Sequence, residues 1–332
     1  YPDSKSYKLE QNYRSTSTIV ETANSLIDFN ENQIKKTVWT DNEKGEKIIL
    51  CKCNSDSDEG RLVANTIFEI KLREQVFPKD FAVLYRTNAQ SRSIEEALRK
   101  KNIPYKIYGG LSFYQRKEIK DILAYCRLTI NPNDEEAFKR VINYPSRGIG
   151  NTTLQKIIAT SNNSNVGIWN LINNLDDFEH NISKGTCKKI NEFALLIKSY
   201  ISQLNKYDAY FLAEHIAKSS GIFNDLYHDK SPEGVSRFEN IQELLNGLKD
   251  FCENNNENLL SHYMRDVALL TTQDNEKKED FNKVTLMTVH AAKGLEFRYV
   301  FVVGLEQNLF PSLLASDNQE SLEEERRLFY VA

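Results

Sequence analysis

The sequence predicts an α/β fold in which a mostly parallel sheet, covered by helices, is interrupted by a large all-helical inserted domain. Three observations predict it. Strand-like and helix-like segments alternate over about the first hundred residues. From about residue 113 to residue 273, apolar residues recur at three- and four-residue spacing, with almost no alternating runs. Strands then return near residues 284 and 299, so the chain is expected to re-enter the sheet that it left.

The first part of the chain is expected to alternate strands and helices joined by short turns. A helix follows Thr18, which together with Glu21 has the Thr-x-x-Glu form of a capping box. The elements expected after it are a strand at 47–53, a helix at about 58–74 capped within residues 55–57, a strand at 81–85, a helix at about 91–101 and a strand at 105–108. Alternation with short turns is typical of a parallel sheet.

The insertion is expected to hold roughly eight helices separated by Asn- and Asp-rich breaks. One apolar stripe, for example, is formed by Ile119, Ile122, Leu123 and Cys126. Beyond the insertion, strands are expected at 284–289 and 299–303. The predicted domains are therefore residues 1–113 for the first part of the sheet domain, 114–276 for the insertion and 277–332 for the second part of the sheet domain.

Composition excludes several function classes. The chain has 332 residues, of which 27% are charged and 40% hydrophobic, as in ordinary globular proteins. Its net charge of −4 gives no global attraction to nucleic acid, so any DNA contact must come from local clusters and backbone amides. No apolar run approaches the roughly 20 residues that span a bilayer, so no membrane partner is expected.

The cysteines and the ends of the chain lead to two further expectations. The five cysteines form no metal-ligand pattern, so no metal site is predicted, and reduced thiols favour a cytoplasmic location. The chain begins at Tyr1 rather than Met and stops inside an expected helix at Ala332. Both ends are therefore expected to be cut.

Three charged segments carry the chemistry. They are Leu9-Glu10-Gln11-Asn12-Tyr13-Arg14-Ser15, the stretch from Val284 to Phe297 that contains Thr288-Val289-His290-Ala291-Ala292-Lys293-Gly294-Leu295-Glu296, and Glu323-Glu324-Glu325-Arg326-Arg327-Leu328-Phe329-Tyr330-Val331-Ala332. Each places an arginine or another polar group at the end of a strand or the start of a helix, where an anion is readily held. Taken alone, Tyr13-Arg14 reads as a surface pair and the last segment as a solvated helix face.

In their order along the chain and in their residues, these segments resemble the motifs of the C-terminal half of a UvrD/PcrA/Rep-type DNA helicase. The resemblance implies a second RecA-like domain with its helical insertion, and a missing N-terminal RecA-like half as partner. In such enzymes ATP binds with Mg²⁺ between two RecA-like domains, and the missing domain supplies the phosphate loop and the Mg²⁺ ligands. The resemblance also implies 3′ to 5′ movement along single-stranded DNA, driven by ATP hydrolysis.

The resemblance assigns roles to individual residues. Arg14 becomes a phosphate-sensing arginine, a role suited to a guanidinium that stays charged and offers two donors. Tyr13 becomes the base-stacking residue, and Glu296 the group on the ribose. Arg327, chosen over Arg326 by alignment on Tyr330-Val331-Ala332, becomes the second arginine at the γ-phosphate.

A second set of residues is implied in DNA contact. At the sheet edge these are Arg86 and Asn88 after one strand, and Thr288 and His290 after another. Ser312 stands where several relatives have a histidine near the DNA, which puts that contact in doubt. In the insertion a Gly-x-Gly turn that leads into a helix exposes N–H groups to phosphate, and the family has a similar Gly-Ile-Gly element facing duplex DNA. The residues predicted there are Arg147, Gly148, Gly150 and Thr152.

Two absences shape the prediction. The sequence contains no Gly-x-x-x-x-Gly-Lys-[Ser/Thr] loop, so this chain alone is predicted to be inactive as an ATPase. The acidic run from Asp134 to Glu136 follows Asn131-Pro132-Asn133 rather than a strand, and is interpreted as a helix N-terminus and not a metal site.

Three alternatives to the helicase reading remain open. They are the helicase subunit of an AddA-type helicase–nuclease, a non-catalytic DNA-binding module and a helical interaction scaffold. DNA-repair proteins are further candidate partners.

Overall fold

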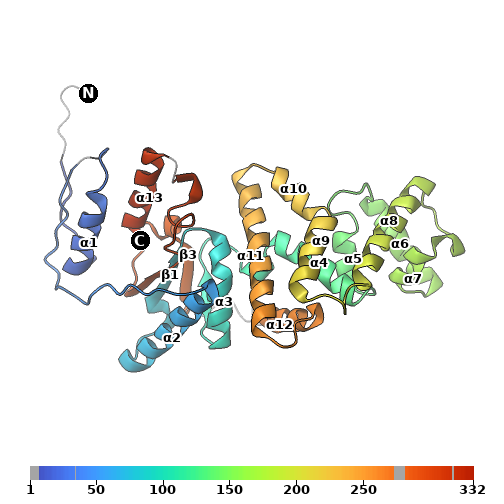
Figure 1. Ribbon diagram of the computed structural model, residues 1–332, viewed down its shortest axis with the longest axis horizontal. Helices are drawn as coiled ribbons and strands as arrows, with labels where there is room; N and C mark the ends of the chain where they lie inside the picture. The colour runs from blue at the N-terminus through green and yellow to red at the C-terminus, as the bar shows by residue number, and fades with distance from the viewer. Residues whose placement is uncertain (1–6, 34, 273–280, 316–317) are drawn as a thin grey trace, which may run out of the picture. The chain divides into compact units, whose positions relative to one another are not determined.

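The computed structural model describes residues 7–33, 35–272, 281–315 and 318–332. The chain forms two compact units. The first contains residues 1–110 together with 279–332, and the second contains residues 111–278. The first unit is therefore built from two segments that are far apart in the sequence, drawn in blue and red in Figure 1, and the second is one continuous stretch.

A four-stranded parallel sheet is the centre of the first unit. Its strands are β1 (Phe81–Tyr85), β2 (Tyr105–Ile107), β3 (Val284–Thr288) and β4 (Tyr299–Val302), in the order β2-β3-β1-β4. Val83 of β1 is paired with Leu286 of β3 on one side and with Phe301 of β4 on the other. The expected strands at 81–85, 105–108, 284–289 and 299–303 are confirmed to within two residues.

Alternate residues of β1 serve two separate cores, because successive side chains of a strand point to opposite faces. Phe81, Val83 and Tyr85 pack on the face covered by α2 (Asp56–Glu74) and α3 (Ser91–Lys100). Ala82 and Leu84 pack on the other face, against α13 (Gln319–Val331) and the 3₁₀ turn η6 (Val289–Ala292). All five residues of β1 are buried, so the strand is apolar on both faces, as expected for a sheet with helices on both sides.

The segment before α2 differs from the prediction. Residues 47–53 form no strand: they have no ladder hydrogen bonds, and Ile49 and Leu50 are 80% and 88% exposed. The prediction was wrong because β-forming residues make a strand only when another strand satisfies their backbone groups. The expected cap within residues 55–57 is confirmed, since Ser55 accepts from the N–H of Asp58.

Helix α1 (Ser17–Ile27) also begins differently from the expectation. Its N-cap residue is Thr16, whose side chain makes no capping hydrogen bond. Thr18 lies inside the helix, and its hydroxyl donates to the carbonyl of Lys44 at 2.7 Å. The capping box predicted from Thr18 and Glu21 is therefore wrong: Thr18 holds a neighbouring loop instead.

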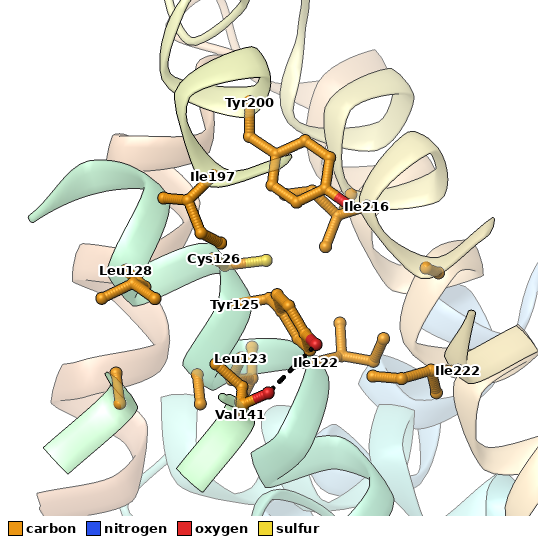
Figure 2. Close-up of a cluster of buried hydrophobic side chains, with 14 of the residues drawn as sticks. Ile122, Leu123, Tyr125, Cys126, Leu128, Val141, Ile197, Tyr200, Ile216 and Ile222 are labelled. Carbon is orange, nitrogen blue, oxygen red and sulfur yellow. Dashed lines mark hydrogen bonds between the residues drawn. The ribbon is translucent and has the colours of Figure 1, made fainter. Parts of the chain in front are cut away.

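The second unit is helical, as predicted, around one apolar core. Its α-helices are α4 (Lys117–Ile130), α5 (Glu135–Val141), α6 (Asn151–Ser164), α7 (Ile168–Asn173), α8 (Lys184–Ile201), α9 (Ala209–Ser219), α10 (Ile222–His228), α11 (Pro232–Asn254) and α12 (Leu260–Thr272). Figure 2 shows the centre of this core, where Tyr125 and Cys126 of α4 lie among aliphatic side chains of several helices. The hydroxyl of Tyr125 donates to the carbonyl of Tyr144 at 2.5 Å.

Side-chain caps begin several of these helices. Asp134, Ser183, Asp208 and Ser231 each accept a hydrogen bond from a backbone N–H in the first turn of the helix that follows. The interpretation of residues 134–136 as a helix N-terminus is confirmed, and Asp134 also accepts from Arg127 at 2.8 Å.

Short 3₁₀ turns complete the structure: η1 (Pro78–Asp80), η2 (Asn88–Gln90), η3 (Phe113–Gln115), η4 (Leu175–Asp177) and η7 (Leu313–Ala315). Within the described residues, no group of three or more His, Cys, Asp or Glu side chains is placed to hold a metal ion. In that same part of the chain, each helix is too short or too polar to cross a membrane.

Candidate functional site

A tight turn before α1 presents Arg14 to a residue almost three hundred positions away. The Oδ1 of Asn12 accepts from the backbone N–H groups of both Arg14 and Ser15 at 2.8 Å, which fixes the turn. The Nε of Arg14 donates to Oε2 of Glu296 at 3.2 Å. Both side chains are exposed, at 52% and 72%, so each can also meet a ligand. Tyr13 beside them is 78% exposed, with its hydroxyl on Gln11.

Glu296 reaches this position because the chain turns sharply after β3. The side chain of Thr288, at the end of β3, accepts from the N–H of Ala291 and starts the turn η6. Gly294 follows with φ of 87°, a left-handed conformation that favours glycine. Thr288 is half-buried and His290 is at the surface. The turn therefore carries two predicted DNA residues and ends at the predicted ribose residue.

Helix α13 holds the loop that follows α1. The Glu323 carboxylate, 1% exposed, accepts from the N–H groups of Glu31 at 2.9 Å and Asn32 at 3.4 Å. Arg327 donates to the carbonyl of Asn32 at 2.7 Å and to Glu324 at 2.9 Å. Arg326 donates to Oδ1 of Asn30 in the same loop. Both arginines of this helix therefore reach the loop after α1.

The predicted nucleotide residues are only partly brought together. Arg14 and Glu296 are in direct contact at the start of α1, whereas Arg327 contacts the loop at its end. A helix of 11 residues is about 16 Å long. Among the described residues, no hydrogen bond or ion pair links Arg327 to Arg14 or Glu296.

A second cluster lies at the carboxyl ends of β1 and β3. Arg86 follows β1 and donates to Glu325 of α13: its Nε lies 3.1 Å from both carboxylate oxygens, and its Nη2 lies 2.7 Å from Oε1. Ser312 approaches the same carboxylate at 3.4 Å through its N–H. Although His290 lies at the surface, its imidazole is partly shielded from water, and this desolvation is the main cause that lowers its pKa. The charge of Arg86 adds to the shift, while Glu325 opposes it. The predicted DNA residues Arg86 and His290 therefore share one electrostatic environment.

Gln90 fixes the backbone on which Arg86 stands. Its Oε1 accepts from the N–H of Arg86 at 2.9 Å and from the N–H of Thr87 at 2.8 Å. A Cβ added to Gly304 would lie only 1.8 Å from the amide nitrogen of Gln90. Asn88, at the start of η2, is exposed. Sequence reasoning missed Gln90, because its partners are backbone groups.

The Gly-Ile-Gly turn of the second unit is built around Asn143 and Arg147. Oδ1 of Asn143 accepts from the N–H groups of Arg147 and Ile149, both at 2.9 Å. Gly148 has φ of 70°, and Gly150 is the N-cap of α6 with no side-chain capping bond. Gly148, Gly150 and Thr152 are all exposed, so this helix start is open to solvent.

Arg147 itself points into the fold. Its Nη1 donates to the carbonyls of Val141, Tyr144 and Pro145, and its Nη2 donates to the carbonyl of Ser220 at 3.0 Å. The guanidinium also lies 5.4 Å from the ring centre of Phe193. These bonds give Arg147 a structural role that the sequence did not reveal, and its predicted DNA contact stays a prediction.

Comparison with known proteins identifies the family. Residues 7–332 match the model of the UvrD-like helicase C-terminal domain. The chain belongs to this family. The α/β fold of RecA-like class with a helical insertion, expected from the sequence, is thereby confirmed.

Three relatives that match the whole chain share one name. The chain is 38% identical to the ATP-dependent DNA helicase PcrA of Leuconostoc citreum, 39% identical to PcrA of Bacillus subtilis (strain 168) and 38% identical to PcrA of Staphylococcus aureus (strain Mu50 / ATCC 700699). Each match covers 100% of this chain and 45% of the relative. The chain therefore spans about half the length of the curated relatives it matches.

Proposed function

We propose that this chain forms one wall of the ATP cleft and part of the DNA track in an ATP-dependent DNA helicase that moves 3′ to 5′. The single observation that carries the proposal is the contact of Arg14 with Glu296. An exposed guanidinium suits a triphosphate, and an exposed carboxylate suits the hydroxyls of a ribose. The two groups are held together on turns with fixed backbone geometry, and Tyr13 stands exposed beside them.

The chemistry of these residues fits ATP. Bound ATP supplies a phosphoanhydride whose cleavage releases the energy for movement. Arg14 would donate to the γ-phosphate as negative charge develops there, and Tyr13 would stack on the base. Arg327 is proposed as a second donor, supported by its place on the same unit and its fixed attachment to Asn32. The described residues include no cluster suited to Mg²⁺, so its ligands are proposed on a partner RecA-like half.

The DNA track is proposed at the carboxyl ends of β1 and β3. Arg86, Asn88, Thr288 and His290 would contact phosphates and sugars of single-stranded DNA, because polar groups at this edge of a parallel sheet usually face the ligand. In the second unit, Gly148, Gly150 and Thr152 would meet duplex phosphate through the open start of α6. Lys189 of α8 supports this, because its Nζ lies 2.6 Å from the Cβ position of Gly148.

The wider setting of the chain follows the same proposal. All five cysteines are free thiols, which fits action in the cytoplasm. The partners proposed are single-stranded and duplex DNA, a RecA-like half that carries the phosphate loop, and DNA-repair proteins.

The proposal is tested by Arg14→Ala in a polypeptide that joins this chain to its ATP-binding half. ATP hydrolysis stimulated by single-stranded DNA should fall by about a thousandfold or more, which is the effect of losing an arginine finger. The affinity for single-stranded DNA should stay within about twofold, because Arg14 lies outside the cluster at the end of β1. Arg61→Ala is the matched control: Arg61 is exposed on α2 and pairs with Asp58, so its loss should leave both quantities unchanged.

Two results would contradict the proposal. Hydrolysis that survives Arg14→Ala unchanged would exclude Arg14 as a donor to the γ-phosphate. Measurable ATP turnover by this chain alone would show that it holds a complete phosphate site.

A further inference from the structure

Glu325 stands between the two proposed ligand sites. It lies on α13, two residues after Glu323, which holds the loop following α1, and two residues before Arg327. Its own carboxylate accepts three hydrogen-bond contacts from Arg86. The helix that carries the proposed second nucleotide arginine is thus attached, through one side chain, to the first residue of the proposed DNA track.

The geometry of this pair leaves one edge of Arg86 available. A guanidinium has five N–H donors. Glu325 takes the edge formed by Nε and Nη2, and no hydrogen bond from Nη1 to another described residue accompanies it. The Arg86 side chain is 23% exposed, while that of Glu325 is 9% exposed. Arg86 can therefore keep its carboxylate partner and still present Nη1 to a phosphate.

Arg86 lies in a cluster whose carboxylates offset its positive charge. Glu325 offsets the positive charge of Arg86, and the charged groups that face His290 are Arg86 after β1 with Glu325 and Glu324 on α13. Partial desolvation and Arg86 lower the pKa of His290, which favours the neutral imidazole. A phosphate that approaches Arg86 consequently meets a guanidinium whose field is partly cancelled by a carboxylate behind it.

We propose that Glu325 is a positioning residue that orients Arg86 toward DNA phosphate and offsets its charge, so that the track holds single-stranded DNA weakly enough to release it. A motor that steps along a strand has to break each phosphate contact it makes, and a neutralised arginine makes a contact that breaks readily. Because Glu325 belongs to α13, a displacement of Arg86 also acts on the helix that carries Arg327. This inference rests on the proposed DNA role of Arg86.

The test measures binding of a fluorescent oligothymidylate to this chain by anisotropy, over a series of salt concentrations. Glu325→Gln should bind about three to ten times more tightly at low salt, because a negative charge within several ångströms of the phosphate is lost. Its salt dependence should also steepen by up to about 0.7 in log–log slope, since Arg86 then acts as a full cation. Glu325→Asp keeps the charge and should bind within about twofold of the original chain.

Two controls accompany these variants. Glu320→Gln removes the same charge from an exposed position of the same helix, and should leave DNA affinity unchanged. NMR titration of His290 reports the cluster without DNA. In Glu325→Gln the pKa of His290 should fall further, because the carboxylate that raises it is gone. If the pKa of His290 shifts in this direction, the Glu325→Gln variant has kept the structure of the cluster.

The outcomes separate the inference from the proposed function. If Arg86→Gln leaves DNA affinity unchanged, the proposed DNA role of Arg86 fails. If Arg86→Gln weakens binding but Glu325→Gln leaves affinity and salt slope as they were, the inference alone fails. Weaker binding by both Glu325 variants would show that the carboxylate only supports the structure. Equal tightening by Glu325→Asp and Glu325→Gln would overturn the account based on charge.

Discussion

Gly304→Ala should loosen the end of β1 more than its small size suggests. Gly304 directly follows Val303, whose N–H bonds the carbonyl of Leu84, and it has φ of 68°. For an alanine, that left-handed conformation costs about 1–2 kcal/mol of free energy. Its Cβ would also lie 1.8 Å from Nε2 of Gln90 and 3.1 Å from Leu309. The amide of Gln90 therefore has to move.

Moving Gln90 has a second cost. Its Oε1 is the acceptor for the N–H groups of Arg86 and Thr87, and neither residue is fully exposed. Each hydrogen bond contributes roughly 0.5–1.5 kcal/mol net. Together with the backbone strain, the expected destabilisation is about 2–5 kcal/mol, concentrated at the loop that carries Arg86.

Hydrogen exchange read by mass spectrometry measures this locally. Peptides that cover β1 and the loop after it should exchange faster in Gly304→Ala, while peptides of α8 in the second unit should not change. Gly185→Ala in α8 is the matched control, because a Cβ there meets nothing within 4 Å, and the substitution should be neutral or stabilising by up to about 1 kcal/mol. The double variant Gln90→Ala with Gly304→Ala should cost less than the sum of the two. Unchanged exchange at β1 in Gly304→Ala, or strict additivity in the double variant, would refute the steric argument.

Two further predictions concern the core of the second unit. Tyr125→Phe should destabilise this unit by about 1–3 kcal/mol in urea unfolding, because the hydroxyl that donates to the carbonyl of Tyr144 is lost from a buried site. A midpoint equal to that of the original chain would show that Arg147 satisfies this carbonyl alone. Burial raises the pKa of Cys126 to about 12. At pH 8, iodoacetamide should therefore label the exposed Cys51 within minutes and leave Cys126 unlabelled until urea unfolds the chain. Early labelling of Cys126 in native protein, located by mass spectrometry, would contradict this burial.

The sequence predicted the layered fold well because the pattern and the environment agree. The five residues of β1 are apolar and all buried, and the helical spacing of the insertion corresponds to one continuous core. Residues 47–53 show the opposite case. Their composition is that of a strand, but a strand depends on a neighbour that local sequence does not describe. The cap predicted at Thr18 was wrong for a similar reason, because its hydroxyl donates to the carbonyl of Lys44, 26 positions away in the sequence.

The resemblance of whole segments to a family, rather than residue type alone, selected the residues of the candidate site. Exposed Arg14 and Glu296 were both singled out and are in contact. The residues that sequence reasoning missed act on backbone groups: Glu323 on the loop after α1, and Gln90 on the turn after β1. Such roles leave little signal in a single sequence, because any polar residue can bond a peptide group.

The attachment of α1 has a consequence for movement. Val20 is the only residue of this helix that is buried, so little apolar surface fastens it to the rest of the first unit. Its two ends are instead tethered by side chains, Arg14 to Glu296 at one end and Asn30 with its neighbours to α13 at the other. An anion that draws Arg14 away from Glu296 would cut the first tether and leave the second intact. The helix would then be free to rotate about its C-terminal end, which stays attached to α13.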